Sequence, residues 1–173
     1  MQRTNAKAIG LLLEEAWPQA YRIAWSILRD ANEAEDAAQE ACALALRAHE
    51  TLRDPSAFRP WFYRIVVNEA RGRRRRRPQE PIPGELQAPF DAPDDRIDVR
   101  RAIDRLDEHA RLSVLLFYYV RLSTTEIANV TGSSPLAVRL RLLAARRRLR
   151  RLLAPDDVSQ LAERTEREPQ VAK

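Results

Sequence analysis

The chain has 173 residues, of which 45% are hydrophobic and 32% charged, and its formal net charge is +5. One cysteine excludes a disulfide framework, two histidines are too few for most histidine-based metal sites, and four scattered glycines exclude a glycine-rich phosphate loop. The longest apolar run, residues 114–120, is too short to cross a membrane, and Glu14 with Glu15 interrupts the N-terminal apolar stretch that a signal peptide would need. We therefore expect a cytoplasmic protein with no metal, no cofactor and no membrane insertion.

Charge and proline divide the chain into parts. Residues 78–98 hold 6 acidic residues against 1 basic residue, together with five of the 11 prolines, whereas residues 99–154 hold 12 basic against 4 acidic residues. Because proline is excluded from helix interiors, we expect 78–98 to be a flexible, extended acidic linker between two basic modules, residues 1–77 and 99–154. Residues 155–173 are expected to be a polar tail.

Two helices are expected at the start of the first module. Apolar residues recur at helical spacing over residues 11–28, and Pro18 is expected to break or kink that helix. Asp30 or Asn32 can cap the next helix, over residues 33–48, because this run is rich in good helix formers.

A third helix is expected over residues 57–77, with aromatic residues near its start and arginines at its end. Pro60 is tolerated in its first turn, and the helix ends in the arginines of residues 73–77. Aromatic rings interleaved with arginine suit unpaired bases, because the bases stack on the rings while guanidinium groups bind the backbone. For Trp61, a core position and a base contact fit the pattern equally well.

The second module also predicts helices only. Apolar residues at helical spacing predict two helices, over residues 99–106 and 108–120. A short third helix, over residues 124–130, begins with the capping box Ser123-x-x-Glu126. Since neither module has a strand pattern of any length, the expected fold class is all-α, with two small helical domains.

The end of the second module has the pattern of a helix-turn-helix. Gly132 ends the short helix, Ser134 caps a longer one, and Pro135 takes the first position of that helix. The longer helix predicts an apolar side that packs inward, formed by Val138, Leu142, Ala145, Leu149 and Leu152.

The remaining sides of this longer helix are basic. We expect its arginines to contact DNA, although a solvated basic face is the simpler alternative. Arg139 and Arg141, near the N-terminus of the helix, can form bidentate hydrogen bonds to the O6 and N7 atoms of guanine. The arginines within residues 146–151 are better placed to bind phosphates.

Three polar residues of the first module, Asp36, Gln39 and Glu40, lie within one turn of a helix. Paired carboxylates can carry out acid–base chemistry or hold a metal, but the sequence supplies no nucleophile, poised histidine or substrate pocket for them. A protein-docking face and a solvated face are the two interpretations left. We therefore expect that the chain is not an enzyme.

These motifs, taken in order, resemble those of a bacterial extracytoplasmic-function sigma factor of the sigma-70 family. NEAEDAAQEACALALRA is similar to region 2.2 of that family, and PSAFRPWFYRIVVNEARGRRRRR is similar to its regions 2.3 and 2.4. The stretch LDEHARLSVLLFYYVRLSTTEIANVTGSSPLAVRLRLLAARRRLRRLL resembles regions 4.1 and 4.2. The resemblance spans about residues 11–153 and implies a region 2-like bundle and a region 4-like helix-turn-helix domain.

The resemblance implies a role for each motif in promoter recognition. Docking on the clamp helices of the largest subunit of core RNA polymerase would involve Asp36, Gln39, Glu40 and Arg47. Recognition and melting of the −10 element would involve Arg53, Ser56, Arg59, Trp61, Arg64, Asn68 and Arg71. Recognition of the −35 element would involve Ser134, Ala137, Arg139, Leu140, Arg141, Arg146 and Arg148. The linker would thread through polymerase, which performs the chemistry, and an anti-sigma factor is a common further partner in the family.

The recognition helix departs from the family's pattern because it is unusually apolar. Leu140 stands where a small polar residue is common, and Leu143 and Ala144 stand where polar or basic residues are common. Ala137 replaces a usual threonine. Apolar side chains at such positions can contact the methyl groups of thymine.

Three functions are compatible with these observations to different degrees. The first is a sigma factor that recruits polymerase to promoters, and the second is a helix-turn-helix regulator that acts without docking on polymerase. The third is an enzyme or RNA-processing protein with a basic surface. The D-x-x-Q-E motif beginning at Asp36 favours the first over the second, and the lack of a catalytic constellation disfavours the third.

Overall fold

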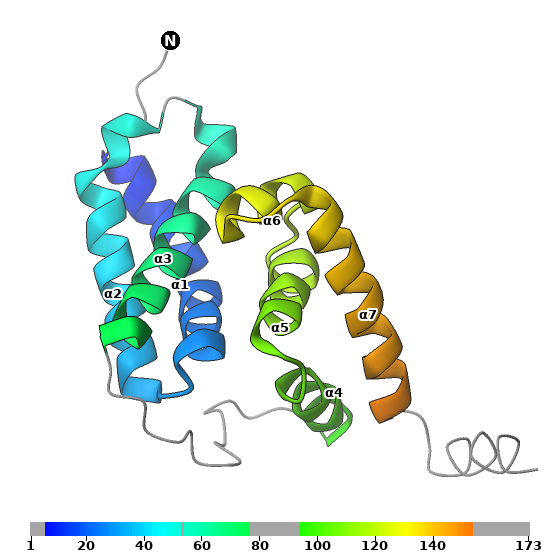
Figure 1. Cartoon of the computed structure of the whole chain (residues 1–173). Helices are drawn as coiled ribbons and strands as arrows, with labels where there is room; N and C mark the ends of the chain where they lie inside the picture. Colours follow the sequence, from blue (N-terminus) through cyan, green and yellow to red (C-terminus); the bar gives the residue numbers. More distant parts are fainter. Residues whose placement is uncertain (1–5, 53, 77–93, 154–173) are drawn as a thin grey trace, which may run out of the picture.

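A computed structural model describes residues 6–52, 54–76 and 94–153 of the chain. Arg53, most of the predicted linker and the predicted tail lie outside these residues. The described part is built of helices without strands, as the sequence predicts (Figure 1). In chain order the elements are α1 (Ala6–Leu28), α2 (Ala31–Arg47), η1 (His49–Thr51), η2 (Pro55–Ala57), α3 (Phe58–Arg76), α4 (Asp94–Asp104), α5 (Glu108–Val114), η3 (Leu115–Tyr119), α6 (Thr124–Thr131) and α7 (Pro135–Leu153).

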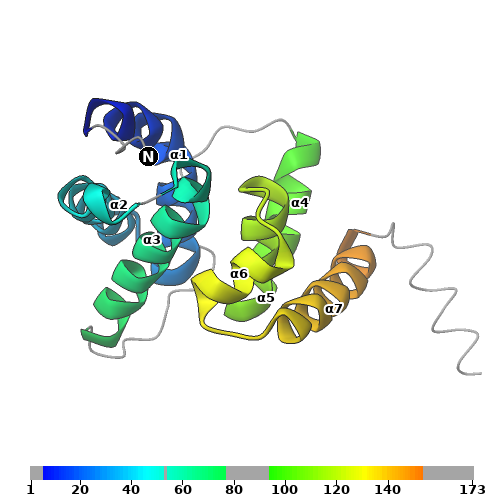
Figure 2. The same cartoon turned by 90° about the horizontal axis from the view of Figure 1, so that it is seen from above.

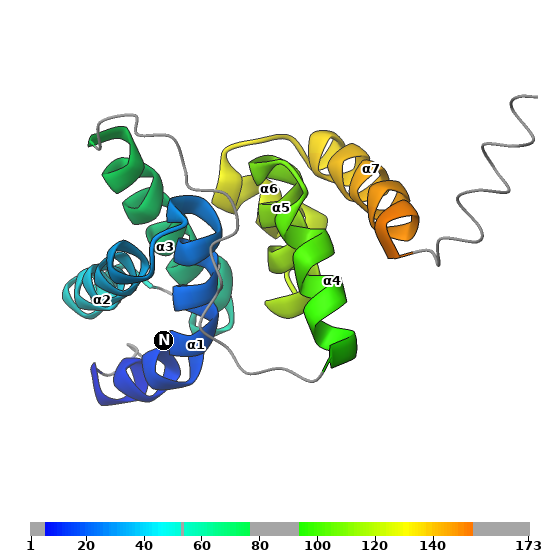
Figure 3. The same ribbon diagram turned by 90° about the horizontal axis from the view of Figure 1, so that it is seen from below.

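The first module is a bundle of α1, α2 and α3, which pack against one another (Figure 1). α1 continues through Pro18, so the proline does not break the helix, and Figure 3 shows that α1 bends along its length. α2 turns its small residues inward, which lets the neighbouring helices approach closely. The buried residues of α2 are Ala34, Ala37, Ala38, Ala41 and Ala45.

Side chains predicted as caps begin two of the helices. Asp30 caps α2 in preference to Asn32, because its carboxylate accepts a hydrogen bond from the backbone N–H of Glu33 at 3.0 Å. Ser123 and Glu126 form both hydrogen bonds of the predicted capping box of α6, at 3.2 and 2.7 Å. The start of each helix therefore follows from local sequence alone.

The predicted helix-turn-helix is confirmed. Gly132 follows α6 in the left-handed conformation, with φ of 68°, and the hydroxyl of Ser134 accepts a hydrogen bond from the backbone N–H of Ala137 at 3.1 Å. Val138 and Leu142 of α7 are buried, so α7 packs on the elements before it. The short helix, the turn and the long basic helix form one unit.

One predicted helix of the second module begins and ends at other residues. α4 runs over Asp94–Asp104 and not over 99–106, so it takes in the last residues that were assigned to the linker. The sequence of its first turn is acidic, and acidic residues are favoured there by the partial positive charge of a helix N-terminus.

The predicted helix over residues 108–120 is α-helical only over Glu108–Val114. The next residues form the π-helical turn η3, in which the N–H of Val120 donates to the carbonyl of Leu115 at 3.0 Å. The wider turn leaves Leu116 buried and Tyr118 exposed. A pattern search at a period of 3.6 residues does not detect such a turn, because each of its hydrogen bonds spans one more residue than in an α-helix.

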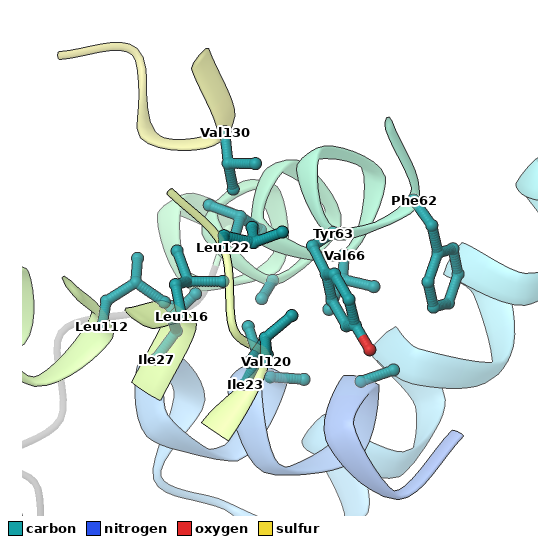
Figure 4. Packing of buried hydrophobic residues seen from close by; sticks show 14 of the residues in the cluster. Ile23, Ile27, Phe62, Tyr63, Val66, Leu112, Leu116, Val120, Leu122 and Val130 are labelled. Atoms are coloured by element: carbon teal, nitrogen blue, oxygen red, sulfur yellow. The ribbon is translucent and has the colours of Figure 1, made fainter. Parts of the chain in front are cut away.

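The two modules share one hydrophobic core. Buried residues of α1 and α3 pack against buried residues of α5, η3 and α6, and Figure 2 shows α3 alongside α6. Figure 4 labels, at this contact, Ile23 and Ile27 of α1, Val66 of α3, and Leu112, Leu116, Val120, Leu122 and Val130 of the second module. The sequence predicts two modules, and the structure adds that they pack face to face.

Replacing Gly132 with alanine should lower the free energy of unfolding by about 1–2 kcal/mol, because a left-handed φ is costly for a residue with a Cβ atom. The space around Gly132 is open, so the cost comes from the backbone and not from collisions. Gly10 supplies the control, because it lies inside α1 in equally open space. Gly10→Ala should stabilise the chain by about 0.5–1 kcal/mol. Urea denaturation measures both effects, and an unchanged stability of Gly132→Ala would contradict the expectation.

Candidate nucleic-acid interface

α7 has a buried side and an exposed side. Val138, Leu142 and Ala145 are buried and Leu149 is partly buried, as the sequence predicts for the inward side. The opposite side carries exposed leucines in its N-terminal half and exposed arginines in its C-terminal half. These residues are Leu136, Leu140, Leu143, Arg147, Arg150 and Arg151. α7 lies at the edge of the molecule farthest from α2, so its exposed side faces away from the first module (Figures 1 and 2).

The arginines predicted to contact the −35 element fall into two groups. Arg139 and Arg148 are exposed on α7. Arg141 is half-buried, and its guanidinium donates to the hydroxyl of Ser133 at 3.2 Å. Arg146 is also exposed, but it donates to the hydroxyl of Tyr118 at 2.6 Å, so Arg141 and Arg146 both form hydrogen bonds within the fold.

The other residues predicted at the −35 element lie at the start of α7. Ser134 is exposed and caps the helix, Ala137 is half-buried, and Leu140 is exposed on the outward side. The outward side of the N-terminal half of α7 is therefore apolar, with the exposed Arg139 beside it.

A second candidate surface lies on α3. Trp61, Arg64 and Asn68 follow one another at three- and four-residue spacing on the side of α3 that faces away from its buried residues. Trp61 is partly buried against the core, with its ring 6.2 Å from that of Phe58, and it keeps part of its surface exposed. Trp61 thus packs on the core and keeps part of its surface accessible, while its contact with a base stays a prediction.

The remaining residues predicted at the −10 element are dispersed. Ser56 donates to Asp54 at 2.7 Å in the turn before α3, and Arg59 is exposed at the start of that helix. Arg71 instead points to the second module, where its guanidinium donates to the carbonyl of Thr131 at 3.0 Å. Arg53 lies outside the described residues.

Arg71 lies at the contact between the two modules. Burial lowers the pKa of Arg71, and the nearby guanidinium groups of Arg141 and Arg75 lower it further. The group nevertheless keeps its charge, because a guanidinium does not lose its proton in proteins. Arg71 therefore joins α3 to the C-terminal end of α6 by a charged hydrogen bond.

The predicted docking face is on α2, at the edge of the molecule opposite α7 (Figure 1). Asp36, Gln39 and Arg47 are exposed, and Glu40 is partly exposed. Arg47 pairs with Glu40 at 2.7 Å, and Asp36 lies 3.7 Å from Arg73 of α3. Exposed ion pairs of this kind contribute little to stability.

Arg111 of α5 is a structural residue that the sequence did not indicate. Its guanidinium is buried and donates to the carbonyl of Ser26 at 3.1 and 2.9 Å, to that of Leu106 at 2.9 Å and to that of Asp104 at 3.2 Å. These carbonyls lie at or just past the C-terminal ends of α1 and α4, where backbone acceptors lack helical partners. The one available signal was that Arg111 is the single charged residue in the mostly apolar stretch 110–120.

A second arginine completes this contact between the modules. Arg29, just after α1, pairs with Asp104 of α4 at 2.6 Å. Arg74 of α3 forms a further ion pair with Glu108 of α5. Several charged hydrogen bonds thus surround the shared apolar core.

Within residues 6–52, 54–76 and 94–153, no group of three His, Cys, Asp or Glu side chains is placed to hold a metal ion. In the same ranges, a membrane could not be spanned by any of the helices, since none is both long and apolar enough.

Known proteins match both modules. Residues 12–79 match sigma-70 region 2, and residues 96–149 match sigma-70 region 4. The chain is 31% identical over 175 aligned residues to the RNA polymerase sigma-H factor of Pseudomonas aeruginosa, which covers 90% of this chain and 91% of that protein. It is 32% identical over 141 residues to the ECF RNA polymerase sigma factor SigM of Mycobacterium tuberculosis. This match covers 78% of this chain and 71% of that protein.

The fold is also similar to that of a solved structure, the sigma factor RpoE in complex with the anti-sigma factor NepR from Bartonella quintana. The TM-score is 0.70 at 22% identity, covering 87% of this chain and 99% of that chain. The helix-turn-helix, the three-helix bundle and the matches to both regions lead to one conclusion. The chain belongs to the sigma-70 family of RNA polymerase sigma factors, in its extracytoplasmic-function group.

Proposed function

We propose that residues 1–77 bind core RNA polymerase and act on the −10 element, while residues 99–154 read the −35 element and residues 78–98 join the two. The observation that carries this proposal is that α7, the second helix of a complete helix-turn-helix, exposes a row of arginines. The matches to region 2 and region 4 support the same division. Polymerase supplies the chemistry in this scheme, so the chain itself has no catalytic site and works beside polymerase in the cytoplasm.

We assign the predicted site residues to two roles, according to whether they form hydrogen bonds to other residues of the fold. At the −10 element we assign base contacts to Trp61, Arg64 and Asn68, which share the exposed side of α3. At the −35 element we assign DNA contacts to Arg139 and Arg148, which are exposed. We assign the bonded residues Arg141, Arg146 and Arg71 to holding the helices in position.

Run-off transcription with purified core polymerase and genomic templates tests this proposal. We expect transcripts that start at defined positions only when the chain is present. Binding to DNA without polymerase-dependent initiation would overturn it in favour of the second function considered above, a stand-alone helix-turn-helix regulator.

Replacing Asp36 and Gln39 together with alanine should weaken binding to core polymerase at least about tenfold, because the few residues at the centre of a protein interface carry most of its binding energy and cost more than about 1 kcal/mol each when truncated. Stability should change by no more than about 0.5 kcal/mol per substitution, since both side chains are exposed. Fluorescence anisotropy of the labelled chain, titrated with core polymerase, measures the affinity.

Glu15→Ala is the matched control, since Glu15 is an exposed acidic residue on α1. It should leave polymerase binding unchanged. If the double variant binds polymerase as tightly as the parent chain, α2 is not the docking face.

An anti-sigma factor is a further proposed partner. The support is that the structurally similar RpoE was solved in complex with one.

A further inference from the structure

Three leucines form an apolar stripe on the outward side of α7. Leu136, Leu140 and Leu143 are 62%, 58% and 45% exposed. Their spacing of four and three residues places them on one line along the helix, opposite the buried side that contains Val138 and Leu142. The stripe is about 10 Å long, which corresponds to about three base pairs of duplex DNA.

Such a stripe indicates a binding surface. Covering exposed apolar groups that lie side by side lowers the free energy, because it removes their surface from water. Contiguous apolar patches therefore mark interaction sites. The same side of α7 continues into Arg147, Arg150 and Arg151, and the sequence of α7 contains no aspartate or glutamate. A ligand that covers this side must therefore combine apolar groups with negative charge along about four turns of helix.

Duplex DNA has this combination in its major groove. The C5 methyl of thymine is the one apolar group that a base pair presents there, and phosphates line both edges of the groove. A helix of this type enters the groove with its N-terminal residues toward the bases, which is the half of α7 that carries the leucines.

The polar residues that could read bases in place of the leucines are few. A leucine side chain has no hydrogen-bond donor or acceptor, so it cannot read the polar edges of guanine, cytosine or adenine. Arg141 is bonded to Ser133 and Arg146 to Tyr118, and both lie off the outward stripe. Arg139 is the exposed arginine next to the leucines.

We propose that Leu136, Leu140 and Leu143 select promoters by contact with thymine methyl groups in the −35 element. This inference rests on the proposed function, because it requires α7 to enter the major groove at that element. It predicts a thymine-containing −35 sequence that is read mainly by apolar contact and not by hydrogen bonds.

Deoxyuridine provides the test, because it keeps every hydrogen-bonding group of thymidine and lacks only the methyl group. The probe is a promoter fragment identified by the run-off assay, prepared with thymidine or with deoxyuridine throughout its −35 region. Binding of the reconstituted holoenzyme is measured by fluorescence anisotropy. We expect deoxyuridine to weaken binding about fourfold for each contacted methyl group, since one buried methyl is worth about 0.8 kcal/mol.

The leucine variants connect this loss to α7. Leu140→Ala should weaken binding to the thymidine fragment and should reduce the difference between the two fragments. Leu153→Ala is the matched control, because Leu153 is 42% exposed at the far end of the same helix. It should leave the difference intact.

Three outcomes would overturn the inference. Equal affinity for both fragments, with promoter-specific initiation intact, would show that α7 makes no contact with the methyl groups. The proposed function as a sigma factor would be unaffected. An unchanged thymidine preference in Leu136→Ala, Leu140→Ala and Leu143→Ala, with loss of binding to a protein partner, would assign the stripe to protein docking. A complete lack of initiation on every template would overturn the proposed function itself.

Discussion

Replacing Arg111 with methionine should lower the free energy of unfolding by about 3–5 kcal/mol, the largest effect that we expect from a single substitution. Methionine keeps much of the aliphatic volume of the side chain but donates no hydrogen bond. The carbonyls of Ser26, Asp104 and Leu106 would lose their charged donor in a buried site. Each buried acceptor left without a partner costs about 1–3 kcal/mol.

The effect of this substitution should extend across both modules. Arg111 belongs to α5, while Ser26 belongs to α1, so the guanidinium joins elements 85 residues apart. It also places a positive charge at the C-terminal ends of α1 and α4, where the helix dipole favours one. Loss of this group should therefore destabilise the packing of the two modules as well as the local structure.

Urea denaturation followed by circular dichroism measures the change. Arg111→Lys should recover less than half of the lost stability. Lysine has no planar guanidinium, so its single ammonium group cannot reach all of these carbonyls at once. Arg105→Met is the control, since Arg105 is exposed just after α4 and should change stability by about 0.5 kcal/mol or less. A loss below about 1 kcal/mol for Arg111→Met would show that water replaces the guanidinium at these carbonyls.

Replacing Arg147, Arg150 and Arg151 together with glutamine should weaken binding to duplex DNA roughly 100-fold at 0.1 M salt. All three side chains are exposed on the outward side of α7, in the half of the helix beyond the leucine stripe. Each phosphate contact releases condensed counterions, so the slope of log affinity against log salt should fall by about one for each arginine removed. Glutamine is a good helix former, so α7 should remain folded.

The loss should be the same on every sequence, because phosphates carry no base information. Fluorescence anisotropy of the full chain on promoter and scrambled duplexes, across a salt series, measures both quantities. Arg101→Gln with Arg105→Gln is the control, since both residues are exposed on the same module but belong to α4 and the turn after it, not to α7. A loss confined to the promoter duplex would instead assign these arginines to base reading.

These predictions differ in how far the sequence alone supports them. The arginines of α7, the capping box of Ser123 and Glu126, and the turn at Gly132 are all encoded within about 30 residues. Their geometry depends on hydrogen bonds and side-chain spacing between near neighbours. A helix-turn-helix with a basic final helix could therefore be predicted without a structure.

The orientation of individual side chains could not be predicted in the same way. Arg139 and Arg141 are two positions apart on one helix, yet Arg139 is exposed and Arg141 is bonded to Ser133 beside the first module. For Trp61 the sequence left a core position and a base contact open, and only the structure showed that its ring packs beside Phe58 while part of its surface stays exposed.

By itself, the sequence determined that the chain is all-α, that it has two basic helical modules, and that its last helix belongs to a helix-turn-helix. Only the tertiary structure decided that α1 and α3 share a core with α5 and α6, and that Arg111 and Arg71 join the modules. It also decided the bounds of α4 and the π-helical turn η3. The physical reason is the range of the interactions. Caps, turns and helical periodicity act between residues a few positions apart, whereas a buried guanidinium is stabilised by carbonyls brought to it from distant parts of the chain.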